Sequence, residues 1–231
     1  MIYLIQKYAL LTIFFATSFL FAQPSSSVAV LTKVKGNVQI QKSLEKNSEF
    51  SLGKAGQLLN HKDIIKTSAN AFAVLIYLDD KSMVKLRANT NLEIQGERIG
   101  KTLKKNLQLT AGTVRATVSK QRRGEFSISS PTSVASVKGT DLWFQSDAEG
   151  GDVIYCLEGI VQLINNSSGE IVDLLMNQTG LSTPDGNLSV TTTNSADIPV
   201  DEDDSGQEPK EFRIKFKDSD GAEKVLIIKY N

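Results

Sequence analysis

The 231-residue sequence predicts an all-β protein, and three observations support this fold class. Short runs of alternating apolar and polar residues recur from about residue 28 to residue 190, separated by turn-forming residues. Helical periodicity is hard to find outside the N-terminal apolar run. Glycines recur shortly before strand valines, at Gly36-Asn37-Val38, Gly112-Thr113-Val114 and Gly159-Ile160-Val161. Their unequal spacing is not that of a regular solenoid, so an irregular β-helix and a sandwich-like domain both remain open.

The N-terminal segment, residues 1–22, is expected to be a secretory signal peptide. Lys7 precedes an uncharged run of about 15 residues that ends at Ala22, a plausible cleavage residue. Such a run is shorter than the roughly 20 residues of a membrane-spanning helix. The alternative is an uncleaved N-terminal anchor. The sequence therefore predicts an exported protein, periplasmic or secreted, which meets the membrane only if this segment is retained.

The body of the protein is expected to be one β domain, residues 23–190. Its apolar alternations fall at residues 28–31, 34–40, 72–78, 84–94, 103–109, 114–118, 126–128, 153–155, 161–163 and 171–175. The stretch 129–144 is the most informative, because it contains two strand-like runs that bend at Pro131, and Gly139 within it indicates a bulge or the close approach of another backbone. Its Trp143, flanked by Leu142 and Phe144, is expected in the core. Cys156 stands alone, so it excludes an intramolecular disulfide and is expected to be buried.

The chain changes composition after residue 190. Residues 191–210 are polar and predict a flexible linker, and the part from 197 to 208 contains six acids and no base. Residues 211–231 regain strand character and predict a β-hairpin with Asp220-Gly221 at its turn. An isolated hairpin is marginally stable in water. We therefore expect it to dock on the body, on another copy or on a partner.

The sequence offers no recognisable catalytic or metal-binding constellation. His61 lies close to Asp63 without a nucleophile motif nearby, so a solvated turn residue is the ordinary interpretation. The carboxylate runs at Asp79-Asp80 and 201–204 lack the ligand spacing of a metal site. We therefore expect a protein that is not an enzyme and that needs no cofactor or metal.

One basic segment is a candidate surface for an anionic partner such as lipopolysaccharide, an acidic glycan or an acidic protein face. No acid occurs among residues 98–123, which contain Arg98, Lys101, Lys104, Lys105, Arg115, Lys120, Arg122 and Arg123. Basic residues also guard the edges of solvated hairpins, and this interpretation is favoured. The acidic segment 197–208 offers a further alternative, in which it screens the basic face intramolecularly. A formal net charge of +0 together with export argues against a nucleic-acid partner.

Several segments, taken together in their order, resemble the FecR domain, an all-β module of bacterial envelope proteins. They are residues 35–38, 56–59, 63–67, 69–78, 79–83, 107–114, 126–131, 135–140 and 153–161. The resemblance extends over about residues 33–190. It implies a structural rather than a functional role for Gly36, Gly112, Val137, Lys138, Gly139, Thr140 and Gly159. Lys138 replaces the arginine that the family usually has at this position.

The resemblance also implies a function. FecR proteins that regulate iron uptake place a cytoplasmic anti-sigma region and a membrane helix before the domain, whereas here the domain follows the N-terminal segment directly. The expected function is therefore that of a non-enzymatic exported module that binds a protein or glycan partner in the bacterial cell envelope. The alternative is a signal-anchored component of a FecR-type transmembrane signalling system.

Overall fold

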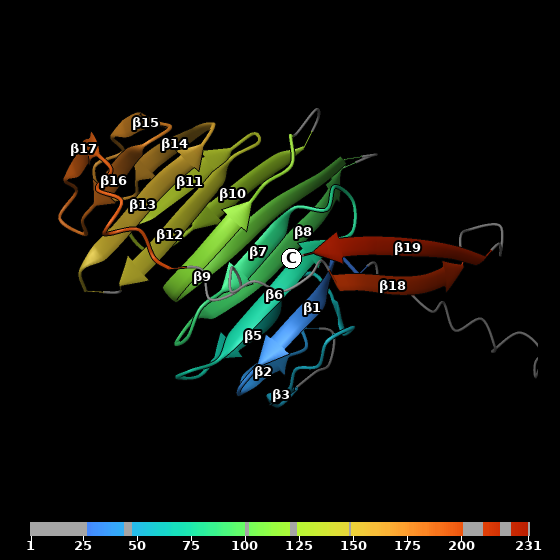
Figure 1. Ribbon diagram of the computed structural model, residues 1–231. Coiled ribbons are helices and arrows are strands. Elements are labelled where there is room, and N and C mark those ends of the chain that lie inside the picture. Colours follow the sequence, from blue (N-terminus) through green and yellow to red (C-terminus); the bar gives the residue numbers. More distant parts are fainter. Residues whose placement is uncertain are drawn as a thin grey trace, which may run out of the picture.

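The computed structural model describes residues 27–43, 48–99, 102–120, 124–147, 149–200, 210–217 and 223–230. The expected signal segment and the acidic residues 201–209 lie outside these ranges. The described chain is built of strands, which confirms the all-β prediction (Figure 1). No helix in the described ranges has the length and apolar character that crossing a bilayer requires.

The strands form two layers packed face to face, so the sandwich-like alternative is the one found. Layer A runs, in spatial order, β4 (Leu58–Leu59), β1 (Ala29–Lys35), β6 (Phe72–Tyr77), β7 (Met83–Leu86), β9 (Thr102–Thr117), β12 (Asp141–Asp147), β13 (Gly151–Glu158), β16 (Gln178–Ser182) and β17 (Leu188–Thr192). Layer B runs β3 (Ser51–Leu52), β2 (Val38–Gln41), β5 (Asp63–Thr67), β8 (Asn91–Ile99), β9, β10 (Glu125–Ser129), β11 (Ser133–Val137), β14 (Ile160–Asn165) and β15 (Ile171–Leu175).

The long strand β9 belongs to both layers. Its first part pairs with β8 and β10 in layer B, and its last part pairs with β7 and β12 in layer A. The change of layer falls at Gly112, whose φ is +112°. A Cβ built there would lie 2.5 Å from the Cα of Thr90, so the crossing needs a residue without a side chain.

The recurring glycines of the sequence mark such crossings. Gly36 lies between β1 and β2, Gly139 between β11 and β12, and Gly159 between β13 and β14. Each has a positive φ, as Gly112 has. At each of these points the chain leaves one layer and enters the other. This placement gives a physical reason for the glycines, because the turn between layers demands backbone angles that other residues rarely adopt.

The core lies between the layers, and alternate residues of each strand fill it. Cys156 is buried there. Trp143 is buried too, but it alternates with Leu142 and Phe144, which belong to the core, so it faces outward from layer A.

The C-terminal hairpin consists of β18 (Lys210–Lys217) and β19 (Glu223–Tyr230), which form a separate two-stranded sheet. Their register places Phe212 opposite Ile228 and Ile214 opposite Leu226. The hairpin predicted from the Asp220-Gly221 signal is therefore confirmed. At the other boundary, β17 runs to Thr192, two residues past the end of the predicted body.

Candidate partner-binding face

The basic residues singled out in the sequence do not form one surface. Side chains on β9 alternate between the two sides of the sheet, so Lys104 faces outward from layer B and Lys105 faces the core. Arg115, past the crossing at Gly112, lies on the outer side of layer A. Arg98 and Lys120 are exposed. Lys101, Arg122 and Arg123 lie outside the described residues.

Lys105 is fully buried, and its assignment to an anion-binding surface is wrong. Its ammonium nitrogen lies 2.8 Å from Oδ2 of Asp79 and 2.5 Å from Oδ2 of Asp80, in the turn after β6. The same nitrogen lies 5.4 Å from the ring centre of Tyr77. The two carboxylates thus offset the free-energy cost of burying this ammonium group. The resulting ion pairs link β9 of layer B to the turn after β6 of layer A.

Arg115 is also engaged within the protein. Its Nε donates to Oδ1 of Asp141 at 3.0 Å, and its Nη2 donates to Oδ2 at 2.8 Å. This two-pronged geometry is the strong form of an arginine–carboxylate pair. The guanidinium also lies 5.8 Å from the ring centre of Trp143. Neither Lys105 nor Arg115 therefore offers its charge to an external anion.

A groove on the outer face of layer B brings Lys104 together with the stretch that carries the family resemblance. We call it the layer B groove. It is lined by Lys104, Gly124, Glu125, Phe126, Ser127, Val134, Ser136, Val137, Lys138, Gly139, Gly159, Ile160, Gln162 and Asp173. These residues come from β9, β10, β11, β14 and β15 and from the two layer crossings at Gly139 and Gly159. The groove exists because strands distant in sequence are neighbours in layer B.

Cross-strand register arranges the outward side chains of this face in rows. A polar row runs across β10, β11, β14 and β15, and it contains Ser127, Ser136, Gln162 and Asp173. An apolar row on one side of it contains Val134, Ile164 and Ile171, and Ile160 pairs with Leu175 on the other side. Directly opposed residues in antiparallel strands share a face and touch. Apolar side chains therefore flank a strip of hydroxyl and amide groups.

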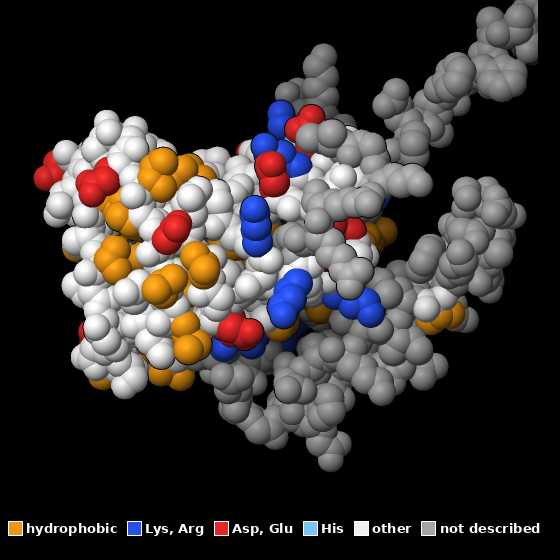
Figure 2. Space-filling model, turned by 90° about the horizontal axis from the view of Figure 1, so that it is seen from above, with side chains coloured by type: hydrophobic (Ala, Val, Ile, Leu, Met, Phe, Trp, Pro, Cys, Tyr) orange, Lys and Arg blue, Asp and Glu red, His pale blue; other side chains and the backbone are white. Residues whose placement is uncertain are grey.

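The apolar residues of this region are unusually exposed. Ile160 is 54% exposed, Ile171 55%, Leu175 50% and Met176 58%. Figure 2 shows hydrophobic side chains gathered over one half of the face with several acidic side chains among them, while the lysine and arginine side chains lie mainly toward the other half. Large apolar residues concentrated on one face are typical of an interaction site.

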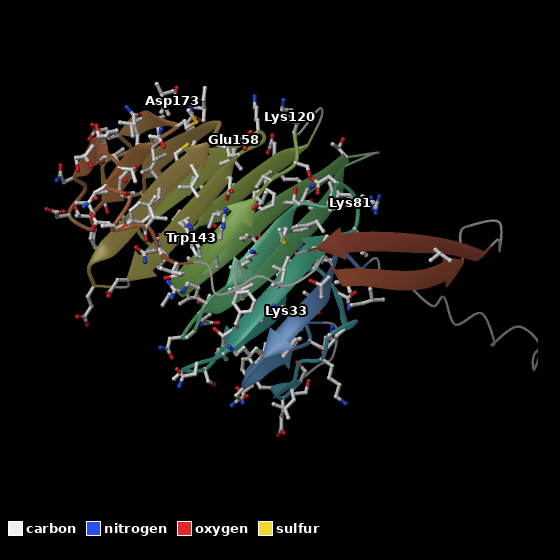
Figure 3. The ribbon with its side chains drawn as sticks, in the orientation of Figure 1. Lys33, Lys81, Lys120, Trp143, Glu158 and Asp173 are labelled. Carbon is white, nitrogen blue, oxygen red and sulfur yellow. The ribbon has the colours of Figure 1, made fainter. Side chains whose placement is uncertain are left out.

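The charges around the layer B groove are mixed. Lys104 pairs with Glu125 at 3.0 Å, and Asp173 accepts a hydrogen bond from Gln162 at 3.5 Å. Lys120, Glu158 and Asp173 lie along one margin of the sandwich (Figure 3). Phe126 is the only aromatic lining residue, and it is 1% exposed. Among its described lining residues, the groove therefore has neither a cluster of uncompensated cations nor an exposed ring on which a sugar could stack.

His61 is not the solvated turn residue that the sequence suggested. Its imidazole is half-buried, and Nδ1 accepts a hydrogen bond from the backbone N–H of Gly96 at 3.1 Å. Nearby Asp63 is buried and accepts bonds from Lys42 and from the backbone N–H groups of Ser43 and Asn60. Both residues therefore stabilise the turn before β5 through hydrogen bonds. Within the described ranges, no three His, Cys, Asp or Glu side chains are grouped so that they could hold a metal ion.

The comparisons with known proteins bear on this same region. Residues 63–162 match the model of the family described as FecR protein. This part of the chain is similar to the FecR family. The match begins with β5 and ends within β14, so it contains the crossings at Gly112, Gly139 and Gly159.

Solved structures give a weaker similarity. A search of the curated proteins found no match. Two crystal structures of a Parabacteroides distasonis protein described as a "putative anti-sigma factor", at 1.65 and 2.50 Å resolution, are similar with a TM-score of 0.49 and 14% sequence identity. Each comparison covers 58% of this chain and 61% of the other chain, so it spans less than two thirds of the relative.

Most of the layer B groove lies within residues 63–162, the part that matches the FecR family, and Asp173 lies beyond it. Of the residues expected from the sequence, Lys104, Val137, Lys138, Gly139 and Gly159 line the groove. Sequence reasoning missed Val134, Ile160 and their neighbours. The available signal was the presence of isoleucine and leucine at alternate outward positions of β14 and β15.

Proposed function

We propose that this protein is a non-enzymatic, exported FecR-type module of the bacterial cell envelope that binds a protein partner through the layer B groove. The observation that carries the proposal is the exposure of Ile160, Ile171 and Leu175 on either side of the polar row of layer B. Protein–protein contacts bury apolar side chains at their centre and surround them with polar groups.

A protein surface suits this groove better than a glycan or a polyanion. Sugar binding favours an exposed aromatic ring, and Phe126, the aromatic residue among the described lining residues, is buried. A polyanion would meet Glu125 and Asp173 as well as Lys104 and Lys138. A protein partner can instead bury the isoleucines and satisfy the serine and glutamine side chains.

The expected energetic contribution can be bounded. Full burial of an isoleucine or leucine side chain is worth about 1.5–3 kcal/mol, and Ile160 and Leu175 still expose about half of theirs. Together they would supply about 1.5–3 kcal/mol to a complex. Because about 1.4 kcal/mol corresponds to a tenfold change in affinity, replacing both should weaken binding about 10- to 100-fold.

A capture experiment with matched variants tests the proposal. The mature protein is compared with an Ile160→Asp, Leu175→Asp variant on envelope extracts of its own host. The control is Leu52→Asp, Leu58→Asp, at residues that are 66% and 43% exposed on β3 and β4, away from the groove. A protein held by the native chain and the control, lost by the groove variant and cross-linked to β14 or β15, would support the proposal.

Two results would contradict it. One is capture of the same proteins by all three chains. The other is capture that periodate oxidation of the extract abolishes, which would indicate a glycan partner.

A signal-anchored component of a FecR-type signalling system is the second candidate, and the family match favours it. The two candidates differ in the fate of residues 1–22. Intact mass of the protein purified from its host distinguishes them, because loss of this segment leaves a free periplasmic or secreted module, whereas retention leaves an anchor. Cell fractionation of the same sample tests the proposed export.

A further inference from the structure

Layer B ends at β15 in an open edge. Strand β15 pairs with β14, and no other strand of the described ranges pairs with it. Beside this pair, the backbone N–H of Asn165 donates to the carbonyl of Glu170. Because hydrogen-bonded pairs alternate along antiparallel strands, the backbone N–H and C=O groups of Ile171 and Asp173 point away from β14. This edge can therefore accept a further strand.

The core beneath the β15 edge is incompletely covered. A Cβ built on Gly180 of β16 would lie 2.8 Å from side-chain atoms of Leu163 and Leu174, so Gly180 faces the core below β14 and β15. Val190 of β17 lies directly opposite Gly180 and faces the same way, one strand further out. Its side chain is 37% exposed, whereas Phe144, an inward residue of a central strand, is fully buried. A strand added beside β15 would cover Val190.

The order of the hairpins indicates which strand belongs at this edge. The first strand of a later hairpin pairs with the second strand of the hairpin two before it, as β14 does with β11 and β16 with β13. By the same rule, the first strand of the hairpin after β16–β17 would pair with β15. That hairpin is β18–β19, which forms a two-stranded sheet of its own. In Figure 1 it lies on the opposite side of the sandwich from β15 and β17.

We infer that β18 of one copy of the protein pairs with β15 of a second copy. A two-stranded hairpin is marginally stable by itself, and pairing with an open edge extends it into a larger sheet. The hairpin lies across the sandwich from its own β15, so the added strand comes from another molecule. The contact joins two different surfaces and therefore links copies head to tail. It uses the edge of layer B rather than its outer face, so it does not rest on the proposed function.

The sequences of the two strands are complementary. Three apolar residues of β18 alternate with three basic ones: Phe212, Ile214, Phe216 and Arg213, Lys215, Lys217. In β15, Val172 and Leu174 pack against the core, and Asp173 between them faces outward at the margin labelled in Figure 3. An antiparallel register that places Ile214 opposite Leu174 also places Lys215 opposite Asp173. Apolar residues then extend the core, and an opposite-charge pair forms on the outer face.

Pairing of β15 with β15 of another copy is less favourable than pairing with β18. Asp173 is the central residue of β15, so a symmetric antiparallel pair would place two Asp173 carboxylates opposite each other. Like charges directly opposed across strands are destabilising. The charge on β15 thus favours the basic strand β18 as its neighbour.

A disulfide between copies tests the pairing and its register. All chains carry Cys156→Ser, which removes the single native thiol. A mature chain with Asp173→Cys is mixed with one carrying Lys215→Cys under mild oxidation. Directly opposed residues of neighbouring strands lie within the distance that a disulfide spans, so a mixed disulfide should be the main product. In the control mixture, Leu52→Cys at the other edge of layer B replaces Asp173→Cys, and little mixed disulfide should form.

A chain that carries both Asp173→Cys and Lys215→Cys distinguishes a second copy from the same molecule. Oxidation should give disulfide-linked dimers and larger species, separated on a denaturing gel without reductant. Disulfide-closed monomers would overturn the assignment to a second copy. Mixed disulfide at no more than the level of the Leu52→Cys control would overturn the pairing itself.

Analytical ultracentrifugation measures the association without added thiols. The native mature chain should show a mass above that of the monomer that rises with concentration. Asp173→Pro removes an N–H that points to the open edge and leaves the bonds to β14 in place, so it should raise the dissociation constant about tenfold or more. Circular dichroism checks that the variant is folded.

The control for the proline variant is Thr192→Pro at the exposed end of β17. The backbone N–H of Thr193 donates to the carbonyl of Asn177 of the neighbouring chain segment, so the N–H of Thr192 points away from β16. This proline therefore makes the same change at the edge of layer A and should leave the association unchanged. A native chain that is monomeric at every concentration, or an equal loss of association in both variants, would overturn the inference.

Discussion

Gly159 packs directly against Gly139: a Cβ built on Gly159 would lie 2.6 Å from the carbonyl oxygen of Gly139. The two residues occupy successive crossings between the layers, after β13 and after β11. Their φ angles are +82° and +130°, so both stand in conformations that favour glycine. The two crossings stack, and their spacing fixes one wall of the layer B groove.

Replacing Gly159 with alanine should therefore be strongly destabilising. Left-handed strain costs about 1–3 kcal/mol, and displacement of the Gly139 carbonyl adds about 1–3 kcal/mol. Gly169→Ala is the matched control, because Gly169 has a φ of +72° but meets no atom within 4 Å. It should lose only about 1 kcal/mol. Urea unfolding measures both, and equal losses would show that the contact with Gly139 is unimportant.

The neighbouring lysines of β9 should differ sharply in their contribution to stability. Lys105→Met leaves Asp79 and Asp80 without their buried cation and should cost about 3 kcal/mol, at the low end for a broken buried pair because both acids are partly exposed. Lys104→Met breaks an exposed pair with Glu125 and should cost less than about 1 kcal/mol. Chemical denaturation of the two variants checks this, and similar midpoints would contradict it.

Asp152 should make stability depend on pH in an uncommon direction. Burial raises its pKa, although the hydroxyls of Ser130 and Ser133 donate to Oδ2 and oppose this. A carboxyl whose pKa is raised on folding contributes stability that is present below its unfolded pKa of about 3.9 and is lost as pH rises through the folded pKa. The native protein should therefore gain stability relative to Asp152→Asn as pH falls from 7 toward 4.

The control for this experiment has the opposite sign. Backbone N–H groups of Glu149 and Gly150 lower the pKa of exposed Asp147. The native protein should lose stability relative to Asp147→Asn as pH falls below about 4 toward the lowered folded pKa. Urea titrations from pH 7 to about pH 3 measure the differences. A constant difference for Asp152→Asn would show that the carboxyl is not perturbed in the folded protein.

Cys156 should be inert in the folded protein. It is fully buried, and burial raises the pKa of its thiol, so little thiolate is present to react. Labelling with Ellman's reagent at pH 8 should proceed only when denaturant unfolds the chain. A Cys156→Ser chain carrying Ser195→Cys, at an exposed position, should react at once. Rapid labelling of native Cys156 would mean that the core opens locally.

The strands were predictable because each keeps one face in the core, and the period-two pattern records that burial. The position of Lys105 was also readable, since it alternates with Leu103, Leu107 and Leu109 on the inward face of β9. The groove could not be found in the same way. It depends on register between β11, β14 and β15, and long-range pairing leaves no local mark on the sequence.

The orientation of Trp143 was likewise not predictable from its neighbours in the sequence. Its apolar neighbours suggest a core residue, yet strand alternation turns it away from them, toward Arg115 on the next strand. The side chains beside Trp143 are those of Arg87 and Arg115, which are distant from it in the sequence. A pattern confined to a few residues carries no such information.

From β10 onward the chain is laid down as hairpins that alternate between the layers. β10–β11 lies in layer B, β12–β13 in layer A, β14–β15 in layer B and β16–β17 in layer A. Each hairpin pairs with the one placed two before it, through β11–β14 and β13–β16. The series continues past residue 162, where the FecR match ends. The architecture is thus extensible: proteins built this way can differ in length by whole hairpins while every earlier pairing stays the same.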